Sequence, residues 1–446
     1  MIRSLAAVGA AALLSSFVQA PADAAVVSVP TVSSLQAAIN SARPGQRIVL
    51  ADGVHRADKP IKITKSRITI AAKRAGGAVF STGGFEFGAV RGVTVEGFVF
   101  DGTSSLTVPA EAEASRITRT TFNGNKDGAS LTVSANDVQV DHNTFSNRTN
   151  EGVYLQVTGP GSEIAQRTWI HHNHFYNHQF TGSNGGESIR LGYSHKQSKS
   201  AYAVIEHNLF EKADGDPEAI SVKSSDNTVR FNTIRSSKGY IVLRHGNRTT
   251  VEGNVLLGSG IRFHGNDHKV FNNYVQNTGD RAIVFGKGSE TDSGPTSTSH
   301  DRPDRVTVAF NTLIGTGAVV DSDTGTYAPK DCVLANNIIQ GSSSKLIDMM
   351  SGSTVKYEGN IVWGGTAGIP SGYRSVDPKL LRDANGLLRL ASGSPALESS
   401  AGTYSYVTRD FDPQARSGKP DVGADEYSSS AIRKPLTAAD VGVSGP

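Results

Sequence analysis

Basic residues recur at one face of four short segments in the middle of the chain. In each segment apolar and polar side chains alternate, so the apolar ones face a core and the basic ones face outward. The outward basic residues are Arg190, Lys223, Arg244, Arg262 and His264. A lysine beside other cations can lose its proton and act as a general base, and arginine binds carboxylates well. This pattern indicates a groove that binds a polyanion and removes a weakly acidic proton from it.

These segments are expected to stack about 4.8 Å apart, which makes one column of like charges that needs compensation. The nearby carboxylates are Glu187, Asp214, Asp216 and Glu218. Together with an exposed Asn184 they supply oxygen ligands of the kind that Ca²⁺ prefers. The alternative is an ion-pair network of the same acids with Arg190 and Lys223.

The elements that position these residues repeat along the chain. An asparagine followed two positions later by an apolar residue returns at Asn143, Asn173, Asn208, Asn232, Asn254, Asn273, Asn311, Asn337 and Asn360. The period is close to 22 residues, with short β-branched segments and Gly/Asn turns, which predicts an all-β coil of parallel strands. We expect each asparagine to pass side-chain hydrogen bonds to the next coil and to tolerate a left-handed backbone. The Leu ladder of leucine-rich repeats is absent from the sequence.

Both ends of the repeat carry different patterns. Residues 32–41 form an amphipathic segment, predicted to be a helix that covers the N-terminal end of the core. The repeat fades after Asp377-Pro378, and residues 421–427 are interpreted as a finishing cap. We therefore expect one β-helix domain at residues 25–428, followed by a loosely attached C-terminal tail at 429–446.

The first 24 residues are predicted to be a signal peptide. A positive start precedes an apolar run at residues 5–18, and Ala22-Asp23-Ala24 gives a small-x-small cleavage pattern. The run is too short for a membrane anchor, so we expect a secreted protein, extracellular or periplasmic. The single cysteine, Cys332, allows no intrachain disulfide. The net charge of only +3 is a weak signal, and a local cationic groove matters more than the total. We expect neither nucleic acid nor a membrane as partner.

Three motifs resemble those of one enzyme family. They are Asn-Gly-Gly-Glu-Ser-Ile-Arg-Leu-Gly at 184–192, Pro-Glu-Ala-Ile-Ser-Val-Lys-Ser at 217–224 and Leu-Arg-His-Gly at 243–246. Together they resemble polysaccharide lyase family six, which comprises alginate lyases and chondroitinase B. The resemblance runs from the N-terminal cap to the motif at 421–427. It implies a single-stranded right-handed parallel β-helix that cleaves an acidic polysaccharide by β-elimination.

The resemblance also implies roles for individual residues. Lys223 would be the Brønsted base and Arg244 the acid, although a guanidinium stays protonated and suits charge stabilisation better. Asn184 and Glu218 would bind calcium, with Asp216 where the family usually has a second glutamate. His245 would lie beside the site. The residues expected to contact sugars are Glu187, Arg190, His245, Arg262 and His264.

Several functions stay open on the residues alone. Alginate is the expected substrate because most of the family acts on it, and a chondroitinase B-like lyase of dermatan sulfate is the first alternative. An alginate epimerase would share the proton abstraction, and a non-catalytic binder would use the same groove without Lys223. A glycoside hydrolase needs paired acids on neighbouring coils, which are not evident. The insertions at 193–202 and 286–304 are expected to wall the groove, unless they are inert surface loops.

Overall fold

The computed structural model describes residues 25–277, 279, 281–292, 294–430 and 433–446. The predicted signal peptide at residues 1–24 lies outside the described residues, so it stays a prediction. Among the described residues no helix is both long enough and apolar enough to cross a membrane.

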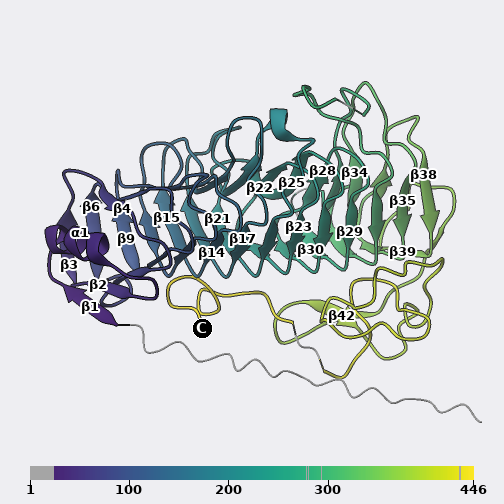
Figure 1. The fold of residues 1–446 in the computed structure, drawn as a ribbon. Coiled ribbons are helices and arrows are strands. Elements are labelled where there is room, and N and C mark those ends of the chain that lie inside the picture. The colour runs from purple at the N-terminus through teal and green to yellow at the C-terminus, as the bar shows by residue number, and fades with distance from the viewer. Residues whose placement is uncertain (1–24, 278, 280, 293, 431–432) are drawn as a thin grey trace, which may run out of the picture.

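Within the described residues the chain winds into a right-handed parallel β-helix with three long sheets (Figure 1). The first sheet has 14 strands: β1 (Val26–Val29), β2 (Arg47–Leu50), β5 (Thr69–Ala72), β8 (Thr94–Glu96), β11 (Arg116–Thr118), β14 (Gln139–Asp141), β17 (Trp169–His171), β20 (Val204–Glu206), β23 (Thr228–Arg230), β26 (Thr250–Glu252), β29 (Lys269–Phe271), β32 (Thr307–Ala309), β35 (Cys332–Ala335) and β38 (Val355–Glu358).

The second sheet carries the predicted site and has ten strands: β10 (Leu106–Val108), β13 (Leu131–Val133), β16 (Leu155–Val157), β19 (Ile189–Gly192), β22 (Glu218–Lys223), β25 (Tyr240–His245), β28 (Ile261–Phe263), β31 (Ile283–Phe285), β34 (Val320–Ser322) and β37 (Ile347–Asp348). Before it in the chain, β4 (Ile61–Ile63) and β7 (Phe85–Phe87) pair in parallel.

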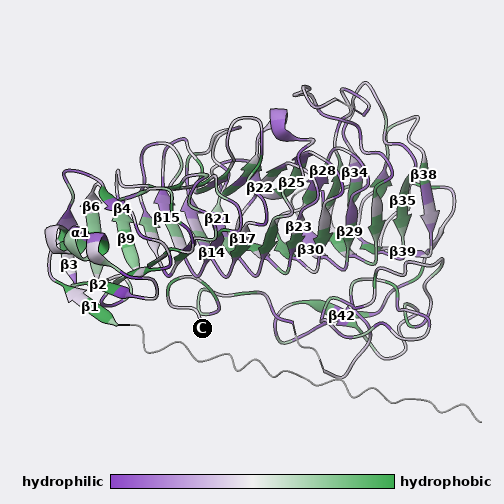
Figure 2. Ribbon diagram, viewed as in Figure 1, coloured by the Kyte–Doolittle hydropathy of each residue, from purple (hydrophilic) through white to green (hydrophobic). Residues whose placement is uncertain are grey.

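The third sheet again has 14 strands: β3 (Gly53–Arg56), β6 (Ala78–Thr82), β9 (Phe98–Asp101), β12 (Thr121–Asn123), β15 (Thr144–Arg148), β18 (His174–His178), β21 (Leu209–Ala213), β24 (Thr233–Arg235), β27 (Val255–Leu257), β30 (Tyr274–Asn277), β33 (Thr312–Gly315), β36 (Ile338–Gln340), β39 (Asn360–Trp363) and β40 (Tyr373–Arg374). Figure 2 shows the strands of the coil mostly green, because each sheet turns its apolar side chains inward. The predicted fold class is confirmed.

The recurring asparagines form a continuous ladder, as predicted. The backbone N–H and side-chain amide of Asn208 both donate to Oδ1 of Asn232, each at 3.0 Å, and Asn232 repeats this with Asn254. The same bonds link successive coils from Asn143 to Asn360. The left-handed backbone, however, belongs to the residue before each asparagine, such as His207 at φ 53° and Phe231 at φ 58°. Expecting the asparagine itself to adopt it was wrong, because the turn is made by the residue before it, while the asparagine side chain bonds to the next coil.

The N-terminal cap is the predicted helix, α1 (Val32–Ser41). Thr31 and Ser34 form a capping box that satisfies the free N–H groups of its first turn. Leu35 and Ile39 are fully buried against the first coils. The helix therefore covers the end of the core that would otherwise meet water.

The C-terminal region lies in a different place from the predicted cap. A short antiparallel hairpin, β41 (Leu380–Arg382) with β42 (Leu388–Leu390), and the loops after it pack on the outside of the third sheet. Contacts run from the Tyr274 hydroxyl, which accepts the N–H of Leu388, to Ile361 beneath Leu390. This region covers a flank of the coil because Tyr274, Ile338 and Ile361 present apolar surface there, so the predicted finishing cap is not over the open end.

The chain end is held by contacts that the sequence did not reveal. The backbone N–H of Leu436 donates to the Thr233 hydroxyl, and that of Gly442 donates to the His172 carbonyl. Val441 is buried, and the guanidinium of Arg433 lies 4.1 Å from the ring centre of Phe231. The segment runs back along the coils, with its end below β14 in Figure 1. Residues 433–446 are therefore docked, and the prediction of loose attachment was wrong for them.

Candidate active site

The predicted basic residues share the outer face of the second sheet, but they do not form one column. Arg190 pairs with Ser221, Ser221 with Val242, and Val242 with Arg262. Lys223 lies opposite Gly192 on one side and His245 on the other. The prediction of a single column was wrong, because Arg190 and Lys223 stand two register positions apart on the evenly paired strands β19 and β22, and bulges between β22 and β25 displace Arg244.

One of these bulges falls at Arg244. Val222 pairs with Leu243, whereas Lys223 pairs with His245, so Arg244 is an extra residue on its strand. A bulge bends the strand and redirects the side chain. Arg244 consequently forms an ion pair with Glu218, which begins the neighbouring strand β22.

Lys223 is largely enclosed, with 10% of its side chain exposed, and its Nζ lies 3.5 Å from Oε1 of Glu187. Burial lowers the pKa of Lys223, and the charges of Arg190 and Arg244 add to this, while Glu187 and Glu218 oppose it. The net effect favours the neutral amine, which is the form that can accept a proton.

Glu187 is only 1% exposed and accepts two hydrogen bonds from Arg190, at 2.8 and 2.5 Å. Burial raises the pKa of Glu187, but the bond to Arg190 and the charges of Arg190 and Lys223 outweigh it and lower the pKa. The alternative of an ion-pair network therefore describes Glu187 well. Its carboxylate faces the two cations and not the solvent, so it positions them in place of the sugar contact predicted for it.

The predicted calcium ligands are Asn184, Asp216 and Glu218, and Glu218 is the one that pairs with Arg244. Asp216 accepts the backbone N–H groups of Gly186 and Glu218, and burial with the charges of Glu187 and Glu218 raises the pKa of Asp216 to about 6. Oε2 of Glu218 is buried without a hydrogen-bond partner among the described residues. Asn184 is exposed at the end of its loop.

These observations fit a cation. A crowded carboxylate and an orphaned carboxylate oxygen mark an excess of negative charge, and calcium takes carboxylate and amide oxygens as ligands. In the part of the chain that the structure describes, no three His, Cys, Asp or Glu side chains converge as ligands. The predicted set of Asp216, Glu218 and Asn184 offers two carboxylates and one amide, and calcium stays a prediction.

A pocket of about 210 Å³ opens beside Arg244. Three arginines line it from successive coils: Arg244, Arg262 and Arg281. Arg262 is paired with Asp323 at 2.5 Å, and Arg281 with Asp321 and Asp323. These aspartates fix the guanidinium groups in place, and a concave wall with three arginines suits a carboxylated sugar. The sequence missed Arg281, because it precedes β31 and shows no alternation.

His245 and His264 lie at the site but are covered, with exposed fractions of 4% and 2%. His300, from the insertion after β31, stacks on both, with ring centres 4.8 and 4.4 Å apart. Burial lowers the pKa of His245 to about 3, aided by the charges of His300 and Arg244. The insertion thus closes over two predicted sugar contacts, and its own histidine was not identified from the sequence.

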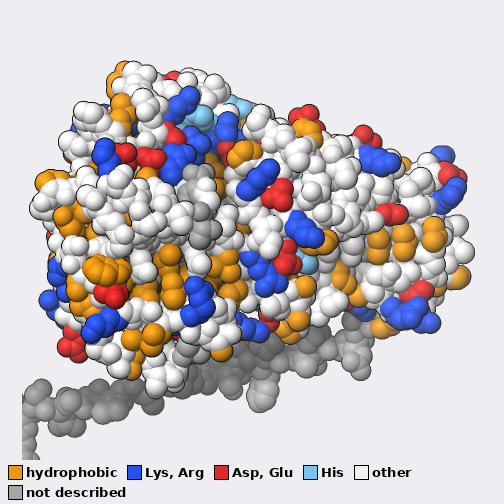
Figure 3. All heavy atoms as spheres, turned by 180° about the vertical axis from the view of Figure 1, so that it is seen from behind, with side chains coloured by type: hydrophobic (Ala, Val, Ile, Leu, Met, Phe, Trp, Pro, Cys, Tyr) orange, Lys and Arg blue, Asp and Glu red, His pale blue; other side chains and the backbone are white. Residues whose placement is uncertain are grey.

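The opposite view of the molecule shows where charged side chains gather. In Figure 3, basic, acidic and histidine side chains crowd together on the face above the place that β28 and β34 occupy in Figure 1.

The chain was compared with known proteins. A sequence model of the chondroitinase B family matches residues 29–348. No curated protein matches the chain significantly. The chain thus belongs to the chondroitinase B family of polysaccharide lyases, polysaccharide lyase family 6, as its three motifs predicted.

Solved structures share the fold. The family 6 alginate lyase AlyGC superposes with a TM-score of 0.74 at 24% identity, over 94% of this chain and 60% of AlyGC. A mannuronic acid-specific family 6 lyase from the human gut microbiota superposes with a TM-score of 0.70 at 22% sequence identity, over 79% of this chain and 91% of that lyase. The family 6 lyase Pedsa3628 from Pseudopedobacter saltans superposes with a TM-score of 0.68 at 21% sequence identity, over 94% of this chain and 99% of Pedsa3628. The chain spans about 60% of the length of AlyGC.

Proposed function

We propose that this protein is a secreted lyase that cleaves alginate by β-elimination, with Lys223 as the base. The observation that carries the proposal is the enclosed Lys223 amine, whose pKa is lowered between Arg190 and Arg244 in a chain of a polysaccharide lyase family. AlyGC is an alginate lyase and the gut enzyme is specific for mannuronic acid, which favours alginate as the substrate.

The first step is removal of a proton. The neutral amine of Lys223 takes the proton from the uronate carbon that bears the carboxylate, and becomes an ammonium. That proton is weakly acidic until the carboxylate charge is offset, which Arg244 and Arg190 can do because they lie on either side of Lys223. The electron pair of the broken C–H bond forms a double bond to the adjacent ring carbon.

The second step is loss of the glycosidic oxygen. The bond between that adjacent carbon and the oxygen breaks, and the oxygen leaves with its electron pair. It needs a proton, which we assign to a water molecule next to Arg244, because a guanidinium does not release its own proton near neutral pH. The products are an unsaturated uronate and a new sugar end.

Calcium is part of the proposal. Asp216, Glu218 and Asn184 would hold it, and the bound ion would supply positive charge to the substrate carboxylate. The chain's own residues would still position the substrate and move the proton. With calcium bound, Glu218 would share its carboxylate between the ion and Arg244.

The arginine-lined pocket supports a polyuronate as the substrate class. A pocket of about 210 Å³ with Arg244, Arg262 and Arg281 on its wall suits one uronate unit beside the scissile bond. Dermatan sulfate is the second candidate, because the family model that matches is that of chondroitinase B. An epimerase or a non-catalytic binder is the outcome if no elimination is seen.

The test is ultraviolet absorbance of purified protein with alginate, dermatan sulfate or polygalacturonate, each with calcium present. Elimination makes a conjugated unsaturated uronate that absorbs, whereas hydrolysis and epimerisation make none. A rise with alginate alone supports the proposal, and a rise with dermatan sulfate alone transfers the protein to the second candidate. No rise with any of them overturns the lyase proposal.

A further inference from the structure

The insertion between β31 and β32 holds His300 in a defined position over the second sheet. The backbone N–H of Ser289 donates to the His300 carbonyl at 2.8 Å, and that of Gly265 donates to the Asp301 carbonyl at 3.2 Å. Further along, the Gln197 amide donates to the Ser297 carbonyl at 2.7 Å, which joins the insertion to the loop after β19. The insertion is therefore hydrogen-bonded both to the coil below it and to the loop after β19.

His300 occupies the surface that His245 and His264 would otherwise present. Its ring stacks on theirs with interplanar angles of 21° and 22°. Both of these rings are buried, and His264 Nδ1 is already 3.1 Å from the Lys287 carbonyl. His300 is only half-buried, so it is the imidazole that a ligand at this face meets.

The surroundings of His300 keep it neutral and place it near the reacting groups. Burial lowers the pKa of His300 to about 4, and the charges of Arg244, Arg262, Lys287 and Lys223 add to this. Within the described part of the chain, neither ring nitrogen of His300 has a hydrogen-bond partner. A neutral imidazole carries one N–H donor and one acceptor, both available here.

We propose that His300 is a substrate-binding residue, donating its ring N–H to a hydroxyl or carboxylate oxygen of the uronate that binds beside Lys223 and Arg244. The stacked His245 and His264 set the plane of the ring, and the insertion sets its position. The identity of the ligand rests on the proposed function, because a uronate is the sugar which that function brings to this face.

The decisive variant is His300→Phe. Phenylalanine keeps a flat ring that can stack on His245 and His264, but it has no N–H. We expect KM for alginate to rise about tenfold with kcat within about twofold, since a net hydrogen bond to a ligand is worth roughly that factor. A purely structural role predicts the opposite pattern: His300→Phe behaves as wild type while His300→Ala loses both stability and activity.

Two measurements complete the test. Thr298→Ala, at an exposed position of the same insertion, is the matched control and should leave KM unchanged. If the wild type makes no unsaturated uronate from any of the three polymers, the lyase proposal fails, and calorimetric titration with an alginate oligosaccharide decides on His300 separately. Binding about tenfold weaker in His300→Phe than in wild type supports the inference, and equal affinity, or no binding by either, overturns it.

Discussion

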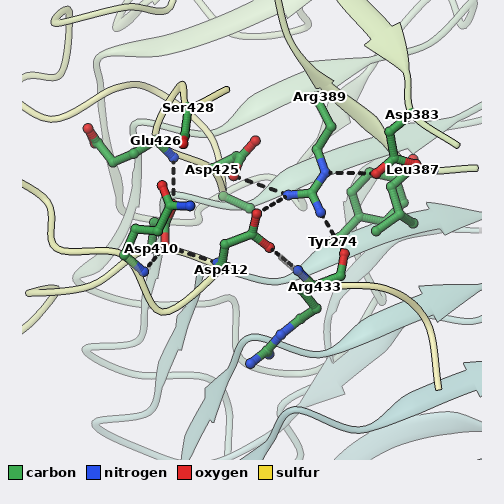
Figure 4. A network of polar contacts seen from close by, with 12 residues as sticks. Tyr274, Asp383, Leu387, Arg389, Asp410, Asp412, Asp425, Glu426, Ser428 and Arg433 are labelled. Atoms are coloured by element: carbon green, nitrogen blue, oxygen red, sulfur yellow. Dashed lines mark hydrogen bonds and ion pairs between the residues drawn. The ribbon is translucent and has the colours of Figure 1, made fainter. Parts of the chain in front are cut away.

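The protein contains two dense clusters of arginine and carboxylate side chains, one at the candidate active site and one in the C-terminal region. In the C-terminal cluster (Figure 4), Arg389 donates to Asp383, Asp412 and Asp425 at 3.2, 2.9 and 3.2 Å, and its Nη2 donates to the Arg433 carbonyl at 2.7 Å. At the active site, Arg244 and Glu218 pair, yet Oε2 of Glu218 lacks a partner among the described residues.

The difference between the clusters lies in unused bonding capacity and not in the size of the pKa shifts. Burial raises the pKa of Asp425 to about 7 and that of Asp216 at the candidate site to about 6, so the structural carboxylate is shifted at least as far as Asp216. All three guanidinium nitrogens of Arg389 nevertheless have hydrogen-bond partners and the side chain is buried, whereas Arg244 and Arg262 keep about a third of their side chains exposed. A shifted pKa alone does not locate catalysis, because structural ion pairs shift pKa values too.

The largest expected effect separates the clusters by activity. Lys223→Ala removes the proposed base, and we expect kcat/KM on alginate to fall about 10³-fold, within the range that a general base contributes. Thermal unfolding should be nearly unchanged, because Glu187 keeps its two bonds to Arg190. Initial rates and melting curves measure both.

The control for this experiment is Lys238→Ala, which removes an exposed lysine from the loop before β25. It should keep the wild-type rate. Retained activity in Lys223→Ala would contradict the assignment of Lys223 as the base. A large loss of stability would show that Lys223, like Arg389, mainly holds the fold together.

The reciprocal experiment breaks the C-terminal cluster. Arg389→Ala leaves Asp412 and Asp425 buried without their cation, and we expect the free energy of unfolding to fall by about 3–5 kcal/mol. Denaturant titration measures this, while kcat of the folded protein stays at the wild-type value. Arg382→Ala, an exposed arginine on the same hairpin, should cost less than about 1 kcal/mol. A marked drop in kcat for Arg389→Ala would mean that the two clusters are coupled.

Calcium removal should act on the active site alone. Chelation with EGTA is expected to lower the elimination rate at least about tenfold, because Asp216 and Glu218 would then repel the substrate carboxylate. Added calcium should restore the rate. The hydrogen bonds of Arg389 in the C-terminal cluster do not involve the metal, so removing calcium should leave them intact. An unchanged rate after thorough chelation would remove the metal from the mechanism.

The sequence predicted the fold because each coil repeats the same physical solution. Asn208, Asn232 and Asn254 recur at the turn where one side chain must satisfy the backbone of the next coil. The helix at 32–41 was equally visible, since its apolar face has to cover an open core. Both signals are local and repeat with a period, so they can be recognised without tertiary contacts.

The active site was predictable in composition but not in arrangement. The strand alternation placed Lys223 and Arg244 on the outer face, yet the bulge that makes Arg244 an extra residue depends on pairing with β22. His300 and Arg281 come from segments without periodicity, so only the folded chain shows that they reach the site. The docking of the chain end likewise depends on contacts more than 200 residues away, such as Leu436 with Thr233.

The smallest expected effect on activity accompanies a pH dependence of stability that belongs to the C-terminal cluster. Burial raises the pKa of Asp425 to about 7 from an ordinary value of 3.8, and the charges of Asp412 and Asp410 add to this against the pull of Arg389. At pH values between the ordinary pKa of 3.8 and the folded-state pKa of about 7, Asp425 holds its proton more tightly in the folded state than in the unfolded state. The contribution of Asp425 to stability is therefore present below about pH 4 and lost as the pH rises towards 7.

Asp425→Asn removes that titration while keeping a side chain of the same shape. The free energy of unfolding of the wild type, minus that of Asp425→Asn, should fall by up to about 4 kcal/mol between pH 4 and pH 7 and then stay level, because each unit of pKa shift is worth about 1.4 kcal/mol. Denaturant titrations at several pH values measure this difference. Elimination rates of the two proteins should keep the same pH profile, because that profile follows Lys223. A difference in stability that is constant with pH would show that Arg389 keeps Asp425 charged, and the C-terminal cluster would then hold a full ion pair where we infer a protonated Asp425.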